Sequence, residues 1–248
     1  MSQRPALLAP DPHAPFPPVA RALRQPDGLL ALGGDLHPAR LLNAYRSGIF
    51  PWYSEGQPIL WWSPDPRMVF DTGGVRLSTR FRRRLRRSPW IARADTAFAD
   101  VIERCASVPR HGQRGTWITP AMQAAYLELH RLGHAHSIEV FADDAPGAPL
   151  VGGIYGVAVG RMFFGESMFS AESGGSKVAL AALARRLHGW GWPLIDGQVE
   201  NPHLRSLGAR FMTRERFVEA VAALAAQPAV ADRWTDAFGV LAAAALAD

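Results

Sequence analysis

Three polar side chains occupy segments of the chain that otherwise look apolar and buried. Glu166 lies in the segment FFGESMF, and Asp196 and Gln198 lie in LIDGQV. Asp196 and Gln198 are two residues apart, so on a regular strand their side chains project from the same face. A buried acid and a buried amide need hydrogen-bond partners, or they carry a desolvation cost. The pattern is typical of groups that hold substrates or move protons, and the alternative is a structural hydrogen-bond network or a turn cap.

Aromatic side chains and arginines form two neighbouring clusters. Residues 45–67 read YRSGIFPWYSEGQPILWWSPDPR, with six large aromatics and no helical or strand period. The later segment RLSTRFRRRLRR holds seven arginines between Arg76 and Arg87, and no acid. Aromatic faces stack on bases and arginines match phosphates, so the two clusters predict a single-stranded nucleic-acid end as partner. The alternative is an aromatic core beside a solvated charged face.

Metal and cofactor chemistry is poorly supported by the residues. His134, His136 and Glu139 offer too few ligands at a strand end to make a metal site. Cys105 is the only cysteine, which excludes an intrachain disulfide and a thiolate metal site. The segment LALGGDL resembles no complete phosphate-binding loop. We therefore expect neither a metal nor a cofactor.

The elements that must position these residues follow from the pattern of proline, capping and apolar residues. Proline punctuates residues 1–68, which predicts a small irregular lobe with one short helix at Arg40–Ser47. Beyond it we expect helices at about 79–87, 97–107, 120–132 and 176–190, two strands joined near Gly160, and further strands at 136–142, 193–200 and 210–217 before a final Ala-rich helix. A run of antiparallel strands followed by strand, helix and strand predicts an α+β fold, in the order of an acetyltransferase-type domain.

The bulk composition is that of a soluble globular enzyme. The 248 residues include 48% hydrophobic and 20% charged residues, with 27 Lys+Arg against 22 Asp+Glu. Arginines supply nearly all the positive charge, since Lys177 is the only lysine. The N-terminus lacks the charged and apolar regions of a signal peptide, and no apolar run approaches membrane-spanning length. We expect a cytoplasmic protein that does not contact a membrane.

Six motifs in order carry a resemblance to a known family. The segments PDGLLALGGDL, AYRSGIFPWY, ILWWSPDPR, GTWITPAM, GESMFS and LIDGQVEN…SLGA resemble the leucyl/phenylalanyl-tRNA–protein transferases of bacteria, from about Phe16 to about Phe217. The resemblance implies a small N-terminal domain over 1–68 and an acetyltransferase-like domain over 69–248. It implies transfer of Leu or Phe, and Met less well, from aminoacyl-tRNA to proteins that begin with Arg or Lys. The modified proteins would then enter regulated proteolysis.

The resemblance also implies roles for matching residues. Asp196 would take up the amine proton or orient the relay, Gln198 would hold the attacking amine, and Glu166 would fix the aminoacyl end. An apolar amino-acid pocket would be formed by Phe163, Met168, Leu180, Leu183 and Ile195, although core packing explains each one individually. The 3′-terminal adenosine would stack near Tyr45, Phe50, Trp52 and Trp117. The tRNA phosphates would be held by Arg76, Arg80, Arg82, Arg83, Arg84, Arg86 and Arg87.

Two departures from the family pattern and two other functions stay open. Ser173-Gly174-Gly175 stand where the family usually has an Asn, which would soften a loop near the pocket. Glu200 is an unusual acid that would attract a basic acceptor or stand as a solvated strand-end carboxylate. An acyl-CoA-dependent N-acetyltransferase would need a pyrophosphate-binding turn, and the segment SAESGGSK lacks it. An RNA-binding module would leave Glu166, Asp196 and Gln198 unexplained. Proton transfer assisted by the tRNA ribose, the preference among Leu, Phe and Met, the oligomeric state and the C-terminal tail are not determined by the sequence.

Overall fold

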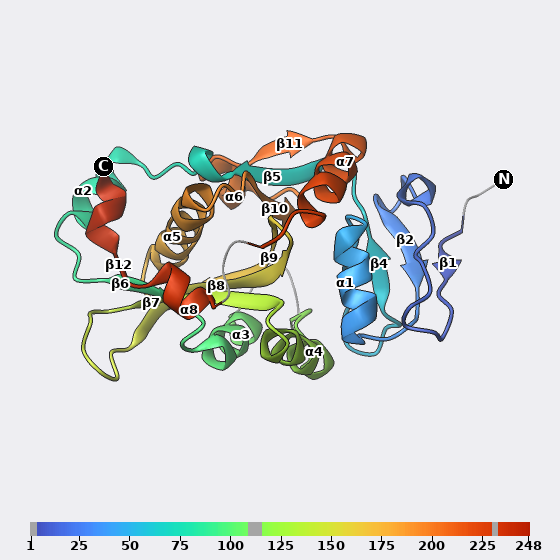
Figure 1. Cartoon of the computed structure of the whole chain (residues 1–248), viewed down its shortest axis with the longest axis horizontal. Helices are drawn as coiled ribbons and strands as arrows, with labels where there is room; N and C mark the ends of the chain where they lie inside the picture. The colour runs from blue at the N-terminus through green and yellow to red at the C-terminus, as the bar shows by residue number, and fades with distance from the viewer. Residues whose placement is uncertain (1–3, 109–115, 230–232) are drawn as a thin grey trace.

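A computed structural model describes residues 4–108, 116–229 and 233–248. Its strands form two sheets, in an α+β arrangement that confirms the expected fold class (Figure 1). The smaller sheet has the order β1-β2-β4-β3 and the larger has the order β11-β5-β10-β9-β8-β7-β6-β12.

The smaller sheet belongs to the N-terminal region. Its strands are β1 (Ala6–Leu7), β2 (Leu29–Leu32), β3 (Phe50–Pro51) and β4 (Leu60–Trp62), with helix α1 (Pro38–Arg46) beside them. A short 3-10 helix spans Val19–Arg21. A small N-terminal region with one short helix was expected, whereas the pairing of its short strands into a sheet was not. The larger sheet begins with β5 (Arg67–Asp71), and the domain division near residue 68 stays a prediction.

The larger sheet is antiparallel over most of its width. Its consecutive strands β6 (Ile91–Ala94), β7 (Ala135–Phe141), β8 (Leu150–Val159) and β9 (Met162–Ser170) pair antiparallel, with the turn between β8 and β9 at the expected Gly160. Helix α5 (Gly175–Gly189) then leads to β10 (Leu194–Gln198), which pairs parallel to β9. The predicted run of strands followed by strand, helix and strand is therefore confirmed.

Shorter elements complete the sheet and its edges. Strand β11 (Arg210–Met212) pairs with β5, and β12 (Leu241–Ala242) pairs with β6. The expected strand over 210–217 is too long, because helix α7 (Arg214–Ala225) begins directly after Thr213. The remaining elements are α6 (Pro202–Ser206), α8 (Trp234–Phe238) and 3-10 helices at Thr72–Gly74 and Ala243–Ala247.

Helices cover both faces of the larger sheet. Helices α3 (Phe98–Ser107) and α4 (Pro120–Arg131) pack on one face, and α5 packs on the other (Figure 1). Strand residues alternate between the two resulting cores: Val69, Phe164 and Leu194 join the first, and Phe70, Phe163 and Ile195 join the second. The alternation assigns the apolar pocket residues of β5, β9 and β10 to the α5 side.

Capping residues set where two of these helices begin. The Thr119 hydroxyl accepts a hydrogen bond from the Met122 N–H at 3.2 Å, and Pro120 occupies the first turn of α4 as expected. Ser78 caps α2 (Thr79–Leu85) by accepting from the Phe81 N–H at 3.3 Å. Both caps were predictable, since Ser or Thr precedes the helical run in each case.

Candidate active site

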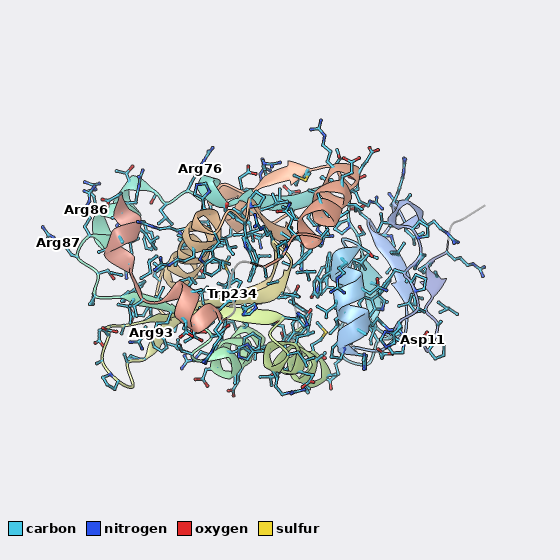
Figure 2. All side chains as sticks on the ribbon, viewed as in Figure 1. Asp11, Arg76, Arg86, Arg87, Arg93 and Trp234 are labelled. Carbon is cyan, nitrogen blue, oxygen red and sulfur yellow. The ribbon has the colours of Figure 1, made fainter. Side chains whose placement is uncertain are left out.

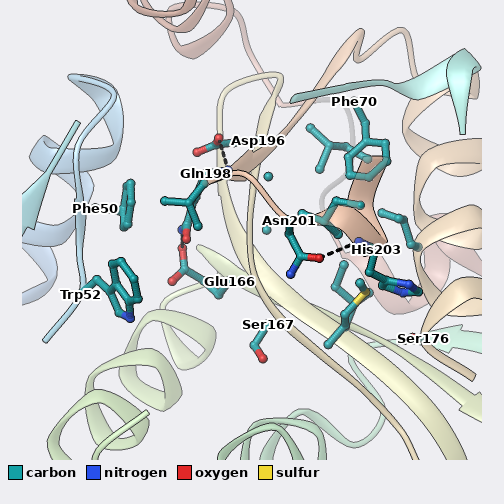
Figure 3. A pocket seen from close by; sticks show the side chains of 18 of the residues that line it. Phe50, Trp52, Phe70, Glu166, Ser167, Ser176, Asp196, Gln198, Asn201 and His203 are labelled. Atoms are coloured by element: carbon teal, nitrogen blue, oxygen red, sulfur yellow. Dashed lines mark hydrogen bonds between the residues drawn. The ribbon is translucent and has the colours of Figure 1, made fainter. Parts of the chain in front are cut away.

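The site lies where two parallel strands separate. The pairing of β10 with β9 runs from Leu194–Met162 to Asp196–Phe164, and it stops there. Beyond this point both strands contribute to the wall of a cavity of about 390 Å³, with Gly165–Met168 on one side and Asp196–Val199 on the other. Figure 3 shows this cavity from close by, with Phe50 and Trp52 on the side opposite His203. We call this point, where β9 and β10 separate and border the cavity, the fork.

Irregular pairing directs the polar side chains at this fork. Tyr155 pairs with Ser167 and Gly156 pairs with Gly165, so Glu166 has no partner in the register of β8 and β9. In the same way Gly197 is passed over where β10 pairs with β5, and Gln198 has a φ of 62°. Bulges of this kind turn a side chain away from regular alternation. The expectation that Asp196 and Gln198 share a face rested on a regular strand, which the bulge at Gly197 interrupts.

Asp196 is tied to an arginine that the sequence analysis did not single out. Its two carboxylate oxygens accept from Nε and Nη2 of Arg67 at 2.9 and 2.7 Å, and both side chains are 0% exposed. The carboxylate also accepts from the backbone N–H of Gln198 at 2.8 Å. Three donors therefore occupy Asp196, which fits orientation of its neighbours better than proton uptake.

Glu166 is the centre of a second hydrogen-bond network. It accepts from the Tyr45 hydroxyl at 2.8 Å, from the Tyr126 hydroxyl at 3.0 Å, and from Nε2 of Gln198 at 2.9 Å. Burial raises the pKa of Glu166 to about 7, with Asp196 adding to the rise while the tyrosine hydrogen bonds and Arg67 oppose it. The carboxyl therefore changes its charge near neutral pH.

The two tyrosines belong to this network rather than to an open wall of the cavity. Their hydroxyls contact each other as well as Glu166. Tyr45 is fully buried, so its ring has no free face for the adenosine stacking that the resemblance implied. Tyr126 was missed because one tyrosine on the inner face of an amphipathic helix has the pattern of ordinary core. Burial, followed by the charge of Glu166, raises the pKa of both phenols well above the usual value.

The apolar end of the cavity uses some of the expected residues. Met168, Leu180 and Ile195 line it, whereas Phe163 and Leu183 are fully buried behind it and do not. Three further apolar residues that were not expected complete this end: Phe70, Ile154 and Leu204. Their alternating strand positions carry no signal that separates pocket wall from core.

Aromatic side chains form the opposite wall. Phe50, Trp52 and Trp117 line the cavity, and their stacking on the 3′-terminal adenosine stays a prediction. Trp61 instead belongs to the core, where its indole N–H donates to the Gly33 carbonyl at 2.8 Å. The aromatic-rich segment therefore contributes both to the core, through Trp61, and to the wall of the cavity, through Phe50 and Trp52.

The seven clustered arginines divide between two surface hollows. Five of them surround a hollow of about 860 Å³ that also touches Trp90: Arg80, Arg83, Arg84, Arg86 and Arg87. Arg76 and Arg82 line another hollow, near Arg185 and His188. Figure 2 shows Arg86 and Arg87 at the end of the molecule away from the N-terminal sheet. Arg84 donates to the Ser173 carbonyl at 3.1 Å, which links the arginine-rich helix α2 to the residues just before α5.

The two departures from the family pattern have plain structural explanations. A Cβ on Gly175 would lie 2.1 Å from the Val151 carbonyl oxygen, and Gly174 has a φ of +96°. These glycines permit close packing of α5 on β8, so the expected softening of the loop has no support. Strand β10 ends at Gln198, and the exposed Glu200 pairs with Arg205 at 3.2 Å, as a solvated strand-end carboxylate does.

Potential metal ligands are engaged with one another. His136 Nδ1 lies 2.7 Å from a carboxylate oxygen of Asp95, and Glu139 accepts from the hydroxyls of Thr96 and Ser137. Among the residues that the structure describes, no three His, Cys, Asp or Glu side chains are grouped to hold a metal ion. Within the same residues, no helix is both long enough and apolar enough to span a bilayer.

Comparison with known proteins gives a consistent result along the chain. The family described as leucyl/phenylalanyl-tRNA protein transferase matches residues 69–222, and the description of its N-terminal domain matches residues 34–65. The chain is 65% identical to a leucyl/phenylalanyl-tRNA–protein transferase of Xanthomonas campestris pv. campestris (strain B100), over 98% of this chain and 96% of that protein. It is 60% identical to the protein of that name from Xylella fastidiosa (strain M23), over 96% of this chain and 97% of the relative.

Solved structures show a more distant likeness. The match to the crystal structure of FemX covers 75% of this chain and 71% of the FemX chain, with a TM-score of 0.44 and 11% sequence identity. The matches in sequence, by contrast, run through both sheets and through the fork that holds Glu166, Asp196 and Gln198. The chain belongs to the leucyl/phenylalanyl-tRNA–protein transferase family.

Proposed function

We propose that this chain transfers leucine or phenylalanine, and methionine less well, from aminoacyl-tRNA to the α-amine of proteins that begin with Arg or Lys. Membership of the family carries the coarser statement, that the chain is an aminoacyl-tRNA-dependent transferase. The acceptor preference, the passage of the product to regulated proteolysis and a cytoplasmic location are part of the proposal.

One observation carries the proposal most directly. The cavity at the fork of β9 and β10 joins an apolar end to a polar rim that holds Glu166 and Gln198. An aminoacyl ester has the matching shape, since an apolar side chain lies next to a polar amine and carbonyl. The wall of Phe50, Trp52 and Trp117 then stands where the adenosine would follow.

The chemistry needs little beyond positioning. The nitrogen of the acceptor amine forms the amide bond with the ester carbonyl carbon, the ester C–O bond breaks, and a proton from the amine ends on the departing ribose oxygen. The reaction therefore balances without a cofactor, and the amine has a pKa near 8, so roughly a tenth of it is unprotonated and reactive at pH 7. Holding the two reactants together lowers the activation free energy by roughly several kcal/mol.

Gln198 is the residue best placed to hold the amine. Its Nε2 donates to Glu166, which leaves the Oε1 oxygen to accept a hydrogen bond from an incoming N–H. Asp196 orients this residue through the Gln198 backbone N–H, while its own oxygens stay on Arg67. Glu166 contributes the charge that changes near pH 7, beside the point where the aminoacyl amine would lie.

Selection among donors follows from the shape of the apolar end. Met168, Leu180 and Ile195 offer contact area to an unbranched or γ-branched side chain. One methylene is worth only about 1–3 kcal/mol in such a pocket, so shape must exclude β-branched side chains. The arginine helix would hold acceptor-stem phosphates, which makes tRNA binding sensitive to salt and mostly independent of sequence.

The test is transfer of labelled leucine from Leu-tRNA to two peptides that differ only in a first residue of Arg or Asp, with acetyl-CoA as a control donor. The proposal predicts label on the Arg peptide alone and no acetylation. Label on the Asp peptide would keep the donor chemistry and overturn the acceptor preference. Bound tRNA with no label on either peptide would favour an RNA-binding module.

A further inference from the structure

Arg67 occupies an unusual position for an arginine, inside the junction between the two sheets. It is the first residue of β5 and is 0% exposed. Its guanidinium carbon lies 4.7 Å from the centre of the Phe50 ring and 4.5 Å from the centre of the Phe217 ring. Nη1 donates to the Gly48 carbonyl at 3.1 Å, so each guanidinium nitrogen has a partner.

Two of these contacts reach residues that line the cavity. Nε and Nη2 hold both oxygens of Asp196, and the same carboxylate accepts from the backbone N–H of Gln198. That bond spans the bulge and holds Gln198 at its φ of 62°, a left-handed conformation that is strained for a residue other than glycine. The conformation of the bulge sets where the Gln198 side chain can reach Glu166.

The aromatic contact acts on the other wall. Phe50 lines the cavity and is held against the flat guanidinium, which in turn is backed by Phe217 of α7. The guanidinium therefore touches the aromatic wall directly and the polar rim through Asp196. Figure 3 shows Phe50 and Asp196 on neighbouring sides of the same cavity.

We propose that Arg67 is a positioning residue that fixes the Gln198 amide, through Asp196, and the Phe50 ring in one geometry for aminoacyl transfer. This inference rests on the proposed function. A buried ion pair by itself adds little stability compared with apolar residues of the same volume. Here the pair joins two parts of the cavity wall, which a hydrophobic replacement would not do.

The test replaces Arg67 with lysine and compares it with a matched control. Lysine keeps the charge but loses the planar fork and the flat face that stacks on Phe50. Arg40 is the control, because it is also buried and holds Asp35 together with the carbonyls of Ala9, Pro10 and Asp11, away from the cavity. Arg40→Lys therefore loses a comparable set of bonds without touching the cavity wall.

Steady-state transfer is measured for both variants with aminoacyl-tRNA and an Arg peptide. Arg67→Lys is expected to lower kcat about tenfold to a hundredfold with KM for the peptide changed less than about threefold, since small misplacements cost rate more than binding. Arg40→Lys is expected to lower the melting temperature but to keep kcat within about twofold of the wild type. Equal losses of kcat in the two variants, or none in Arg67→Lys, would overturn the proposal.

A double-variant cycle tests whether Arg67 acts through Gln198. The double variant Arg67→Lys/Gln198→Ala is expected to have the same kcat as Gln198→Ala alone. Its KM for aminoacyl-tRNA can still change, because Arg67 also holds the Phe50 ring. Rates that multiply in kcat would mean that Arg67 acts independently, against the proposal. If Arg67→Lys does not fold, the paired change Arg67→Gln with Asp196→Asn replaces it, with the same loss of kcat expected.

A spectroscopic readout separates this inference from the proposed function. The side-chain amide signals of Gln198, assigned by their absence in Gln198→Ala, should shift in Arg67→Lys and not in Arg40→Lys. If the wild-type protein transfers no leucine, the proposed function is contradicted. A shift of the Gln198 amide signals in Arg67→Lys would then still support the positioning of Gln198 by Arg67. Unshifted signals would contradict the positioning, whatever the transfer activity.

Discussion

Two glutamates lie on strands of the larger sheet that are separated by β8, and they are alike in burial but different in their hydrogen-bond partners. Glu139 on β7 and Glu166 on β9 are both buried, and burial raises the pKa of each to about 7. Glu139 accepts from the Thr96 hydroxyl at 2.8 Å, from the Thr96 N–H at 3.1 Å and from the Ser137 hydroxyl. Glu166 accepts from two tyrosine hydroxyls and an amide, and it borders a cavity.

The difference lies in what encloses each carboxyl. Glu139 is 0% exposed and lines no cavity that borders the fork. Its partners come from its own strand and from the loop beside it. Glu166 is 8% exposed, and its partners Tyr45, Tyr126 and Gln198 come from α1, α4 and β10. A shifted pKa alone therefore does not distinguish the two glutamates, whereas the cavity and the Gln198 amide beside Glu166 do.

The largest expected effect separates the two networks by activity. Gln198→Ala removes the group that holds the amine, and it should lower kcat for leucine transfer about a hundredfold or more, as loss of one preorganised polar contact does elsewhere. Ser137→Ala removes a partner of Glu139 and should leave kcat within about twofold. The two rates are measured under saturating Leu-tRNA, with circular dichroism to check folding. A Ser137→Ala loss as large as that of Gln198→Ala would remove the distinction.

A smaller effect is expected in the pH dependence of transfer. The wild-type rate should rise through two ionisations, one near 7 from Glu166 and one near 8 from the amine. Glu166→Gln should remove the first, move the midpoint toward 8 and lower the rate about tenfold. Glu139→Gln should keep both ionisations, although the pKa of Glu139 is also about 7. Loss of the lower ionisation in Glu139→Gln, rather than in Glu166→Gln, would reverse the two assignments.

The smallest effect is on stability. A carboxyl whose pKa rises on folding keeps its proton in the folded chain while the unfolded chain loses it, so stability falls as pH rises from about 4.5 to about 7. Glu139→Gln has no carboxyl to ionise at this position. Between pH 5 and pH 8 its free energy of unfolding should therefore fall less than that of the wild type, by on the order of 1–3 kcal/mol. Urea unfolding at the two pH values measures this change. An unchanged pH dependence would mean that Glu139 is ionised in the folded protein.

The sequence predicted the larger elements and the polar centre of the site. Thr119-Pro120 marked the start of α4, and the apolar period from Ser176 marked α5, because capping and amphipathic spacing are local signals. Glu166, Asp196 and Gln198 stood out since polar residues interrupted apolar strands. Gly165 and Gly197 lie beside these residues, but they did not predict the two bulges, because a bulge depends on pairing with a strand distant in sequence.

Other parts of the site depend on tertiary contacts that have no local pattern. Arg67 and Tyr126 form their bonds with residues 129 and 40 positions away, respectively. The family resemblance implied that Leu183 and Phe163 belong to the amino-acid pocket, but both are buried in the core and do not line the cavity. The N-terminal sheet was missed because strands of two to four residues are too short to show an alternating pattern.

The most direct measurement of the central claim is the structure of the protein with a stable amide analogue of 3′-phenylalanyl-adenosine. The account predicts the phenyl ring among Met168, Leu180 and Ile195, the adenine against Phe50, Trp52 or Trp117, and the amino group within hydrogen-bond distance of Gln198 or Glu166. An analogue bound beside His136 and Trp234, or with its phenyl ring outside the fork of β9 and β10, would contradict it.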